Sequence, residues 1–166
     1  MLKLGIIGTG SISHHFVEAA HTGGKFQLVA VYSRKLETAE KFVEQYQGVK
    51  LFDQLNDFFK DSFDVVYIAS PNSLHFSQAK MALAAGKHVI LEKPAVTQPH
   101  EWQDLVQTAK EHHCFIFEAA RNYHEDAFAT IKDFLANKQI LGADFNYAKY
   151  SSKMPNLLAG DTPNVF

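Results

Sequence analysis

The sequence predicts an α/β fold in which a doubly wound, mostly parallel sheet carries helices on both faces. Short runs of apolar and β-branched residues alternate with segments of helical periodicity, at the spacing of βαβ units. The first run is followed directly by a glycine-rich turn and a helical segment. With 166 residues, 46% of them hydrophobic, the chain is long enough to bury a sizeable core.

Local signals support the individual elements. Pro99 suits the first turn of a helix, and Gly48 and Gly86 stand where helix C-caps are expected. The apolar residues predicted to face the sheet are Ile12, Phe16 and Ala19, then Ala39, Phe42, Val43 and Tyr46. The expected strands are residues 4–7, 27–32, 49–51, 65–69, 88–91 and 114–118. The expected helices are residues 11–22, 36–46, 55–59, 73–85, 99–112 and 125–137.

The composition changes after Gly142. Residues 143–150 mix β-formers with polar and aromatic residues and predict a strand, whereas the chain from Ser151 onward has no periodic pattern. A last strand without a following element would leave an open sheet edge, which natural domains avoid. We therefore expect this chain to be part of a longer protein.

Composition excludes several classes of partner. The formal net charge of −2 gives no bulk attraction to nucleic acid or to an anionic membrane, and no apolar run approaches the ~20 residues of a membrane span. Lys3 is followed directly by the residues of the first strand and not by the long apolar segment of a signal peptide. We therefore expect a cytoplasmic protein. Cys114 is interpreted as a buried structural thiol. Adjacent histidines at 14–15 and 112–113 point in different directions on a helix, so no metal site is expected.

The turn after the first strand has the pattern of a dinucleotide-binding loop, with Ser13 at the third small position. The first glycine allows the turn, and the second lets the backbone approach a pyrophosphate at the N-terminus of the following helix. Such a hexapeptide alone is often an ordinary turn, but here a strand and a helix flank it as the pattern requires. The cofactor-binding residues predicted here are Gly8, Thr9, Gly10, Ser11 and Ile12.

The end of the second strand bears on the choice of cofactor. NAD-preferring sites place an acidic residue there, against the ribose 2′-hydroxyl. This chain has Ser33 and Arg34 instead, a hydroxyl and a planar cation that suit a 2′-phosphate. NADP is therefore predicted over NAD, and the alternative is that Arg34 and Lys35 form the solvated start of the next helix.

Two further loops follow the fourth and fifth strands, at the sheet edge where open α/β sheets bind ligands. In the first, Pro71 stiffens the turn after Ser70, Asn72 or Ser73 can cap the next helix, and His75 is a ligand group or a structural hydrogen-bonding residue. In the second, Glu92 and Lys93 precede Pro94, which keeps Lys93 extended. A lysine fixed there can stabilise an alkoxide-like substrate oxygen, and a surface lysine is the alternative.

Together these residues resemble the Gfo/Idh/MocA oxidoreductases, a likeness that extends over essentially the whole chain. It rests on the 8–12 turn, Ser70-Pro71-Asn72 with His75, Glu92-Lys93-Pro94, and the Ile140-Leu141-Gly142 turn. The resemblance implies a Rossmann cofactor domain over residues 1–120, with 121–166 a linking helix and the start of a substrate domain. It implies catalysis by Lys93, which would contact substrate and nicotinamide ribose. It also places Ser70, Pro71, Asn72, His75, Glu92, Lys93 and Arg121 among the cofactor-binding residues.

The function predicted from these residues is an NADP(H)-dependent oxidoreductase that interconverts hydroxyl and carbonyl groups. Its substrate would be a small molecule such as a sugar, a polyol or a dihydrodiol, and the full-length protein would form a homo-oligomer. A non-catalytic NAD(P)-binding sensor is the main alternative, because a fold does not guarantee chemistry. A site for another adenine nucleotide, such as S-adenosylmethionine, is a third.

Overall fold

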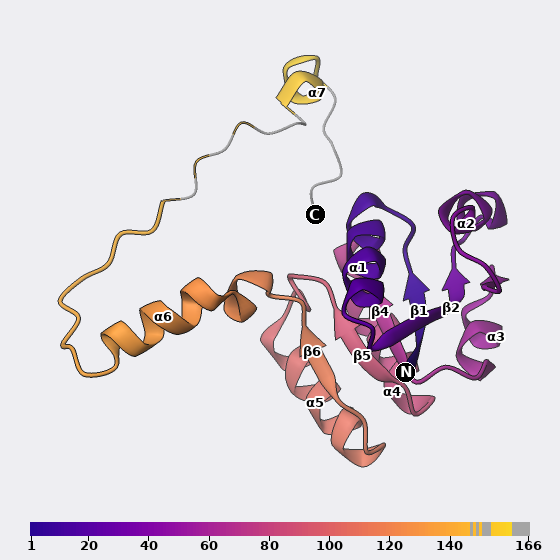
Figure 1. Ribbon diagram of the computed structural model, residues 1–166, viewed down its shortest axis with the longest axis horizontal. Helices are drawn as coiled ribbons and strands as arrows, with labels where there is room; N and C mark the ends of the chain where they lie inside the picture. Colours follow the sequence, from indigo (N-terminus) through magenta and orange to yellow (C-terminus); the bar gives the residue numbers. More distant parts are fainter. Residues whose placement is uncertain (147, 149, 151–153, 161–166) are drawn as a thin grey trace. The chain divides into compact units, whose positions relative to one another are not determined.

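The computed structural model describes residues 1–146, 148, 150 and 154–160 (Figure 1). The chain divides into two compact units, Met1–Ala119 and Ala120–Phe166. The first unit holds the whole sheet and the second is built from short helices.

The first unit is built on a six-stranded parallel sheet with strand order β3-β2-β1-β4-β5-β6. The chain runs outward from β1 in one direction, then crosses over to β4 and runs outward in the other. The carboxyl ends of β1 and β4 therefore form the topological switch point at which such sheets bind ligands. The strands are β1 (Leu2–Ile7), β2 (Phe26–Tyr32), β3 (Lys50–Phe52), β4 (Val65–Ile68), β5 (His88–Leu91) and β6 (Ile116–Glu118).

Helices cover both faces of this sheet, which confirms the predicted fold class. Alternate strand residues enter two separate cores, so that Ile6 and Tyr67 pack on one face while Ile7 and Ile68 pack on the other. The first core is closed by α1 (Ser11–Thr22) and α2 (Leu36–Val43). The second is closed by α3 (Leu55–Lys60), α4 (Asn72–Ala84) and α5 (Pro99–Glu111).

Of the residues predicted to face the sheet from α1, Phe16 packs against the core, but the buried row is shifted by one position. Ser13, Val17 and Ala20 face the sheet, whereas Ile12 is 47% exposed. Ser13 is fully buried, and its small side chain leaves room for the first helical turn to lie close to β1. The prediction for α2 was better, because Ala39 and Phe42 are both buried there.

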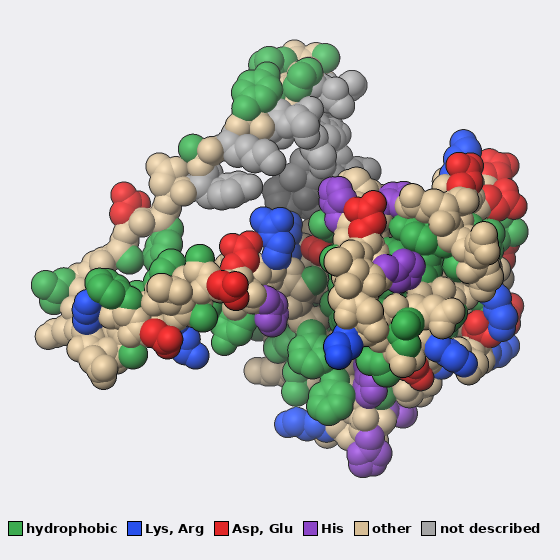
Figure 2. All heavy atoms as spheres, in the orientation of Figure 1, with side chains coloured by type: hydrophobic (Ala, Val, Ile, Leu, Met, Phe, Trp, Pro, Cys, Tyr) green, Lys and Arg blue, Asp and Glu red, His purple; other side chains and the backbone are tan. Residues whose placement is uncertain are grey.

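Charged side chains of both signs are interspersed on the surface of the first unit. Figure 2 shows acidic and basic groups side by side over α2, which carries Glu37, Glu40 and Lys41. In the part of the chain that the structure describes, no helix is long and apolar enough to cross a membrane.

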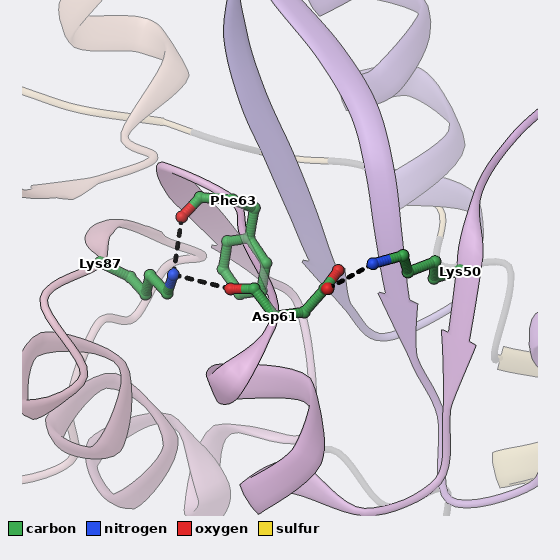
Figure 3. A network of polar contacts seen from close by, with 4 residues as sticks. All are labelled: Lys50, Asp61, Phe63 and Lys87. Atoms are coloured by element: carbon green, nitrogen blue, oxygen red, sulfur yellow. Dashed lines mark hydrogen bonds and ion pairs between the residues drawn. The ribbon is translucent and has the colours of Figure 1, made fainter.

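A hydrogen-bonded network joins the loops at the amino-terminal edge of the sheet (Figure 3). The Lys87 ammonium, just before β5, donates to the carbonyl oxygens of Asp61 at 2.9 Å and Phe63 at 2.8 Å, and lies 4.5 Å from the centre of the Phe63 ring. Lys50 Nζ lies 2.6 Å from the Asp61 carboxylate. Burial lowers the pKa of Lys87, while the Lys50 hydrogen bond lowers that of Asp61. The network therefore ties the α3–β4 loop to the turn before β5.

The second unit contains η1 (Arg121–His124), α6 (Asp126–Leu135) and α7 (Met154–Leu158). Hydrophobic side chains lie along α6 in Figure 2, and Ile131 and Phe134 are more than half exposed. The strand predicted for residues 143–150 is wrong for 143–146, 148 and 150, which form no strand, while 147 and 149 lie outside the described residues. A strand forms only with a hydrogen-bonded neighbour, and sequence composition does not supply one.

Candidate functional site

The β1–α1 turn has the geometry that the glycine pattern predicts. Gly8 has a φ of 99°, and a Cβ built on it would meet the Ala69 carbonyl group, 2.8 Å from its carbon. Only glycine fits there, because both the backbone conformation and the approach to the end of β4 exclude a side chain. Gly10 is the N-cap of α1, and a Cβ on it would meet nothing within 4 Å. Ser11 and Ile12 are the first residues of α1. Because the space beside Gly10 is empty, the N-terminus of this helix is accessible to a ligand.

This turn lines a pocket of about 450 Å³ at the switch point. The pocket brings together the carboxyl ends of β1, β2 and β4, which are far apart in sequence. Six predicted site residues line it, namely Gly8, Thr9, Ser33, Arg34, Ser70 and Pro71. Sequence reasoning missed the other lining residues, which are Ile7, Tyr32, Leu55, Ala69, Leu74, Ser77 and Gln78.

The wall formed by Ser33 and Arg34 is fixed by its backbone. The Ser33 N–H donates to the Phe52 carbonyl oxygen at 3.0 Å. This bond continues the β2–β3 pairing one residue past the end of β2. The Ser33 hydroxyl also bonds to that of Thr38 in α2. Arg34 is exposed and forms no ion pair with any described residue. Since no acidic residue lines the pocket, its guanidinium is the only formal charge among the lining residues.

Two buried side chains of α4 hydrogen-bond to the loop that follows β4. Gln78 accepts a hydrogen bond from the Ser70 hydroxyl at 2.6 Å. His75, 1% exposed, has its Nε2 2.9 Å from the Ser70 carbonyl oxygen and its Nδ1 3.0 Å from the Pro94 carbonyl oxygen. Sequence reasoning missed Gln78, because a glutamine inside a helix carries no local signal for such a role. Both ring nitrogens of His75 are engaged by the backbone, so the structure supports the structural alternative for this residue.

His75 thereby joins the pocket wall to the loop that carries Lys93. The second buried brace of that loop is Tyr67 in β4, whose hydroxyl donates to Glu92 at 2.6 Å. The other Glu92 oxygen accepts the Lys93 N–H at 3.1 Å. Burial, together with the nearby Glu92 carboxylate, raises the pKa of Tyr67 far above its usual range and keeps it a donor. Glu92 therefore holds the loop in place, while the exposed Lys93 side chain bonds to no described residue.

The remaining predicted residues lie elsewhere. Asn72 is the first residue of α4, whose N-cap is Pro71 without a side-chain cap, so the predicted capping by Asn72 or Ser73 is wrong. Arg121 belongs to the second unit, in η1, where its guanidinium lies 3.2 Å from Glu125.

Cys114 is partly buried, and burial raises the pKa of its thiol. The described residues contain no cluster of three or more metal-ligating side chains.

Comparison with known proteins points in the same direction as the geometry. The GFO_IDH_MocA family model, described as an oxidoreductase family with an NAD-binding Rossmann fold, matches residues 2–120. YgjR of Escherichia coli, an uncharacterized oxidoreductase, is 39% identical over 168 residues, which cover 100% of this chain and 51% of YgjR. The scyllo-inositol 2-dehydrogenase (NADP(+)) IolU of Bacillus subtilis is 34% identical over 168 residues, with the same coverage of 100% and 51%.

A solved structure extends the likeness to the backbone. KijD10, a 3-ketoreductase from Actinomadura kijaniata in complex with NADP and TDP-benzene, matches with a TM-score of 0.76 at 26% identity, covering 81% of this chain and 42% of KijD10. The chain spans about half the length of the curated relatives it matches. On the family match over residues 2–120, the chain belongs to the Gfo/Idh/MocA oxidoreductase family, with its NAD-binding Rossmann fold.

Proposed function

We propose that this chain is the cofactor-binding part of an NADP(H)-dependent oxidoreductase that interconverts hydroxyl and carbonyl groups on a sugar, a polyol or a related small molecule. One observation carries the proposal. His75 joins the pocket that contains the glycine turn and Arg34 to the loop that presents Lys93. This link supports a site in which a charged dinucleotide and the Lys93 cation would lie close to each other.

The geometry of the chain supports this choice of cofactor. Gly10 leaves space at the N-terminus of α1, where backbone N–H groups and the helix dipole attract a pyrophosphate. Arg34 lines this pocket and would pair with a ribose 2′-phosphate, and no acid in the pocket wall opposes it. The nicotinamide supplies or accepts a hydride when it is bound.

Lys93 is the proposed catalytic residue. Its ammonium would hydrogen-bond the substrate oxygen and stabilise the negative charge that develops there during hydride transfer. The names of the relatives support this reaction class, because IolU is an inositol dehydrogenase and KijD10 a ketoreductase. Residues 1–120 would form the cofactor domain, and 121–166 would lead into a substrate domain of the whole protein, which we expect to be a cytoplasmic homo-oligomer.

The proposal is tested by turnover of the whole protein. NADPH would be mixed with a panel of keto sugars and keto polyols, and NADP⁺ with the corresponding sugars, polyols and dihydrodiols, while cofactor absorbance is followed. We expect at least one pair to react, with NADPH preferred over NADH. Tight NADPH binding without turnover on any substrate would support the sensor alternative, and failure to bind either cofactor would refute the proposal.

A further inference from the structure

The hydroxyl groups of Ser33 and Thr38 form a chain of hydrogen bonds beside the pocket. Thr38 Oγ1 donates to the Lys35 carbonyl oxygen at 2.7 Å and lies 2.5 Å from Ser33 Oγ. The Lys35 N–H donates to Ser33 Oγ at 3.4 Å. Ser33 lines the pocket, whereas Thr38, the third residue of α2, does not. The hydroxyl of Thr38 therefore contacts the pocket wall through Ser33.

Counting protons fixes the direction of these bonds. A hydroxyl carries one hydrogen, and Thr38 uses its own on the Lys35 carbonyl. The hydrogen shared between the two hydroxyls therefore belongs to Ser33. In this arrangement the Ser33 hydroxyl can accept a hydrogen bond from a ligand in the pocket but cannot donate one.

The two forms of the cofactor differ in what they need from Ser33. A ribose 2′-hydroxyl can donate to the Ser33 lone pair, whereas the 2′-phosphate oxygens require donors. Ser33 can donate to a phosphate only if Thr38 turns its hydrogen from Lys35 to Ser33. The Lys35 carbonyl still accepts the backbone N–H groups of Thr38 at 3.0 Å and Ala39 at 3.4 Å. Reorienting the Thr38 hydroxyl therefore costs one hydrogen bond, the one to the Lys35 carbonyl oxygen.

We infer that Thr38 is a positioning residue that reduces the preference of this site for a 2′-phosphate, an inference that rests on the proposed cofactor function. Arg34 favours NADPH by its charge, while Thr38 opposes it by holding Ser33 as an acceptor. The net contribution of one hydrogen bond corresponds to a change of about fivefold in affinity. Thr38 thus lowers the NADPH over NADH preference by about that factor.

The test is the ratio of dissociation constants for NADH and NADPH, measured by fluorescence titration. Thr38→Val keeps the shape of the side chain and removes the hydroxyl, so we expect the ratio to move about fivefold toward NADPH. Thr38→Ala should give the same shift, while Thr38→Ser restores the chain of bonds and should keep the original ratio. Thr22→Val is the matched control, because Thr22 also donates to a helix carbonyl, that of Glu18, in the last turn of α1.

A double-mutant cycle separates this role from a general structural one. In a Ser33→Ala background, Thr38→Val should leave the ratio unchanged, because the residue through which Thr38 acts is gone. Three results would overturn the inference and leave the proposed function standing. They are an equal loss of affinity for NADH and NADPH, an unchanged ratio of dissociation constants in Thr38→Val, and a change in that ratio that persists in the Ser33→Ala background. If the unmutated protein binds neither cofactor, the proposed function fails and this inference fails with it.

Discussion

The two edges of the sheet use their positively charged side chains in opposite ways. At the amino-terminal edge, the Lys87 ammonium is hydrogen-bonded to two carbonyl oxygens and Lys50 to the Asp61 carboxylate. At the carboxyl edge, Arg34 and Lys93 are exposed and make no side-chain bond to a described residue. Lys50 and Lys87 are thus bonded within the protein, whereas Arg34 and Lys93 remain available to a ligand.

Structural cations in such a fold can be told from candidate ligand-binding cations by whether the protein itself provides their hydrogen-bond partners. A donor satisfied by backbone carbonyls contributes to stability, and removing it leaves those carbonyls unpaired. A cation held at a strand end without a partner contributes little to folding. Mutations at the first edge should therefore change stability and leave ligand binding intact, while mutations of the cations at the second edge should do the reverse.

The largest effect is expected at Lys93. If its ammonium stabilises charge in the transition state, Lys93→Ala in the whole protein should lower kcat by about 10²–10³ while NADPH affinity changes much less. Lys93→Arg should not restore the rate, because the guanidinium is larger and cannot exchange a proton near neutral pH. Steady-state kinetics check this, with Lys60→Ala, another exposed lysine, as the control. An unchanged kcat would show that Lys93 is only a surface residue.

The two glycines of the turn should give contrasting losses. Gly8→Ala forces a side chain into a positive φ and against the Ala69 backbone, so it should destabilise the fold by about 2–3 kcal/mol or more. Gly10→Ala places its methyl group in open space, so it should cost less than about 1 kcal/mol. It should nevertheless weaken NADPH binding, because the methyl group would occupy the proposed approach to the phosphates. Denaturant unfolding and NADPH titration of both variants check the contrast. Similar stabilities for the two variants would contradict the role assigned to Gly8.

Lys87→Met should destabilise the first unit by about 1–3 kcal/mol, because the Asp61 and Phe63 carbonyls lose their shared donor. Met keeps much of the apolar stem that lies over the Phe63 ring. Chemical denaturation measures the loss, and Lys80→Met, which removes an exposed pair with Asp104, serves as the control. Equal, small losses in both variants would mean that the amino-terminal network is no more stabilising than an ordinary surface pair.

The smallest effect is expected at Asp61. Its pKa is lowered in the folded state, chiefly by the Lys50 hydrogen bond, so the ionised form contributes stability above its ordinary pKa of 3.8 that is lost as the pH falls through the lowered value. Since Lys50 is largely exposed, the contribution should be less than about 1 kcal/mol. Asp61→Asn should therefore lose this stability at neutral pH and match the unmutated protein in acid. A loss of equal size at all pH values would rule out the ionic origin.

The sequence was a good guide to the fold, because alternating strands and helices identify βαβ units without knowledge of tertiary contacts. It also indicated that the glycine turn and Arg34 stand at strand ends, where they line the pocket, because local backbone rules specify those positions. The bracing by Tyr67 and Gln78 could not be predicted, because a buried tyrosine in a strand and a glutamine in a helix have no local signature. Their partners lie 25 and 8 residues away and meet them only once the sheet has formed.

The most direct test of the contrast between the two edges compares Arg34→Ala with Lys87→Met in one pair of measurements, NADPH affinity and thermal unfolding. We predict that Arg34→Ala weakens NADPH binding by about tenfold, removes most of the preference over NADH and leaves the melting temperature unchanged. Lys87→Met should lower the melting temperature and leave the affinity of the folded protein unchanged. Equal affinities for NADPH and NADH in the unmutated protein, or a loss of stability without a loss of affinity in Arg34→Ala, would contradict the account.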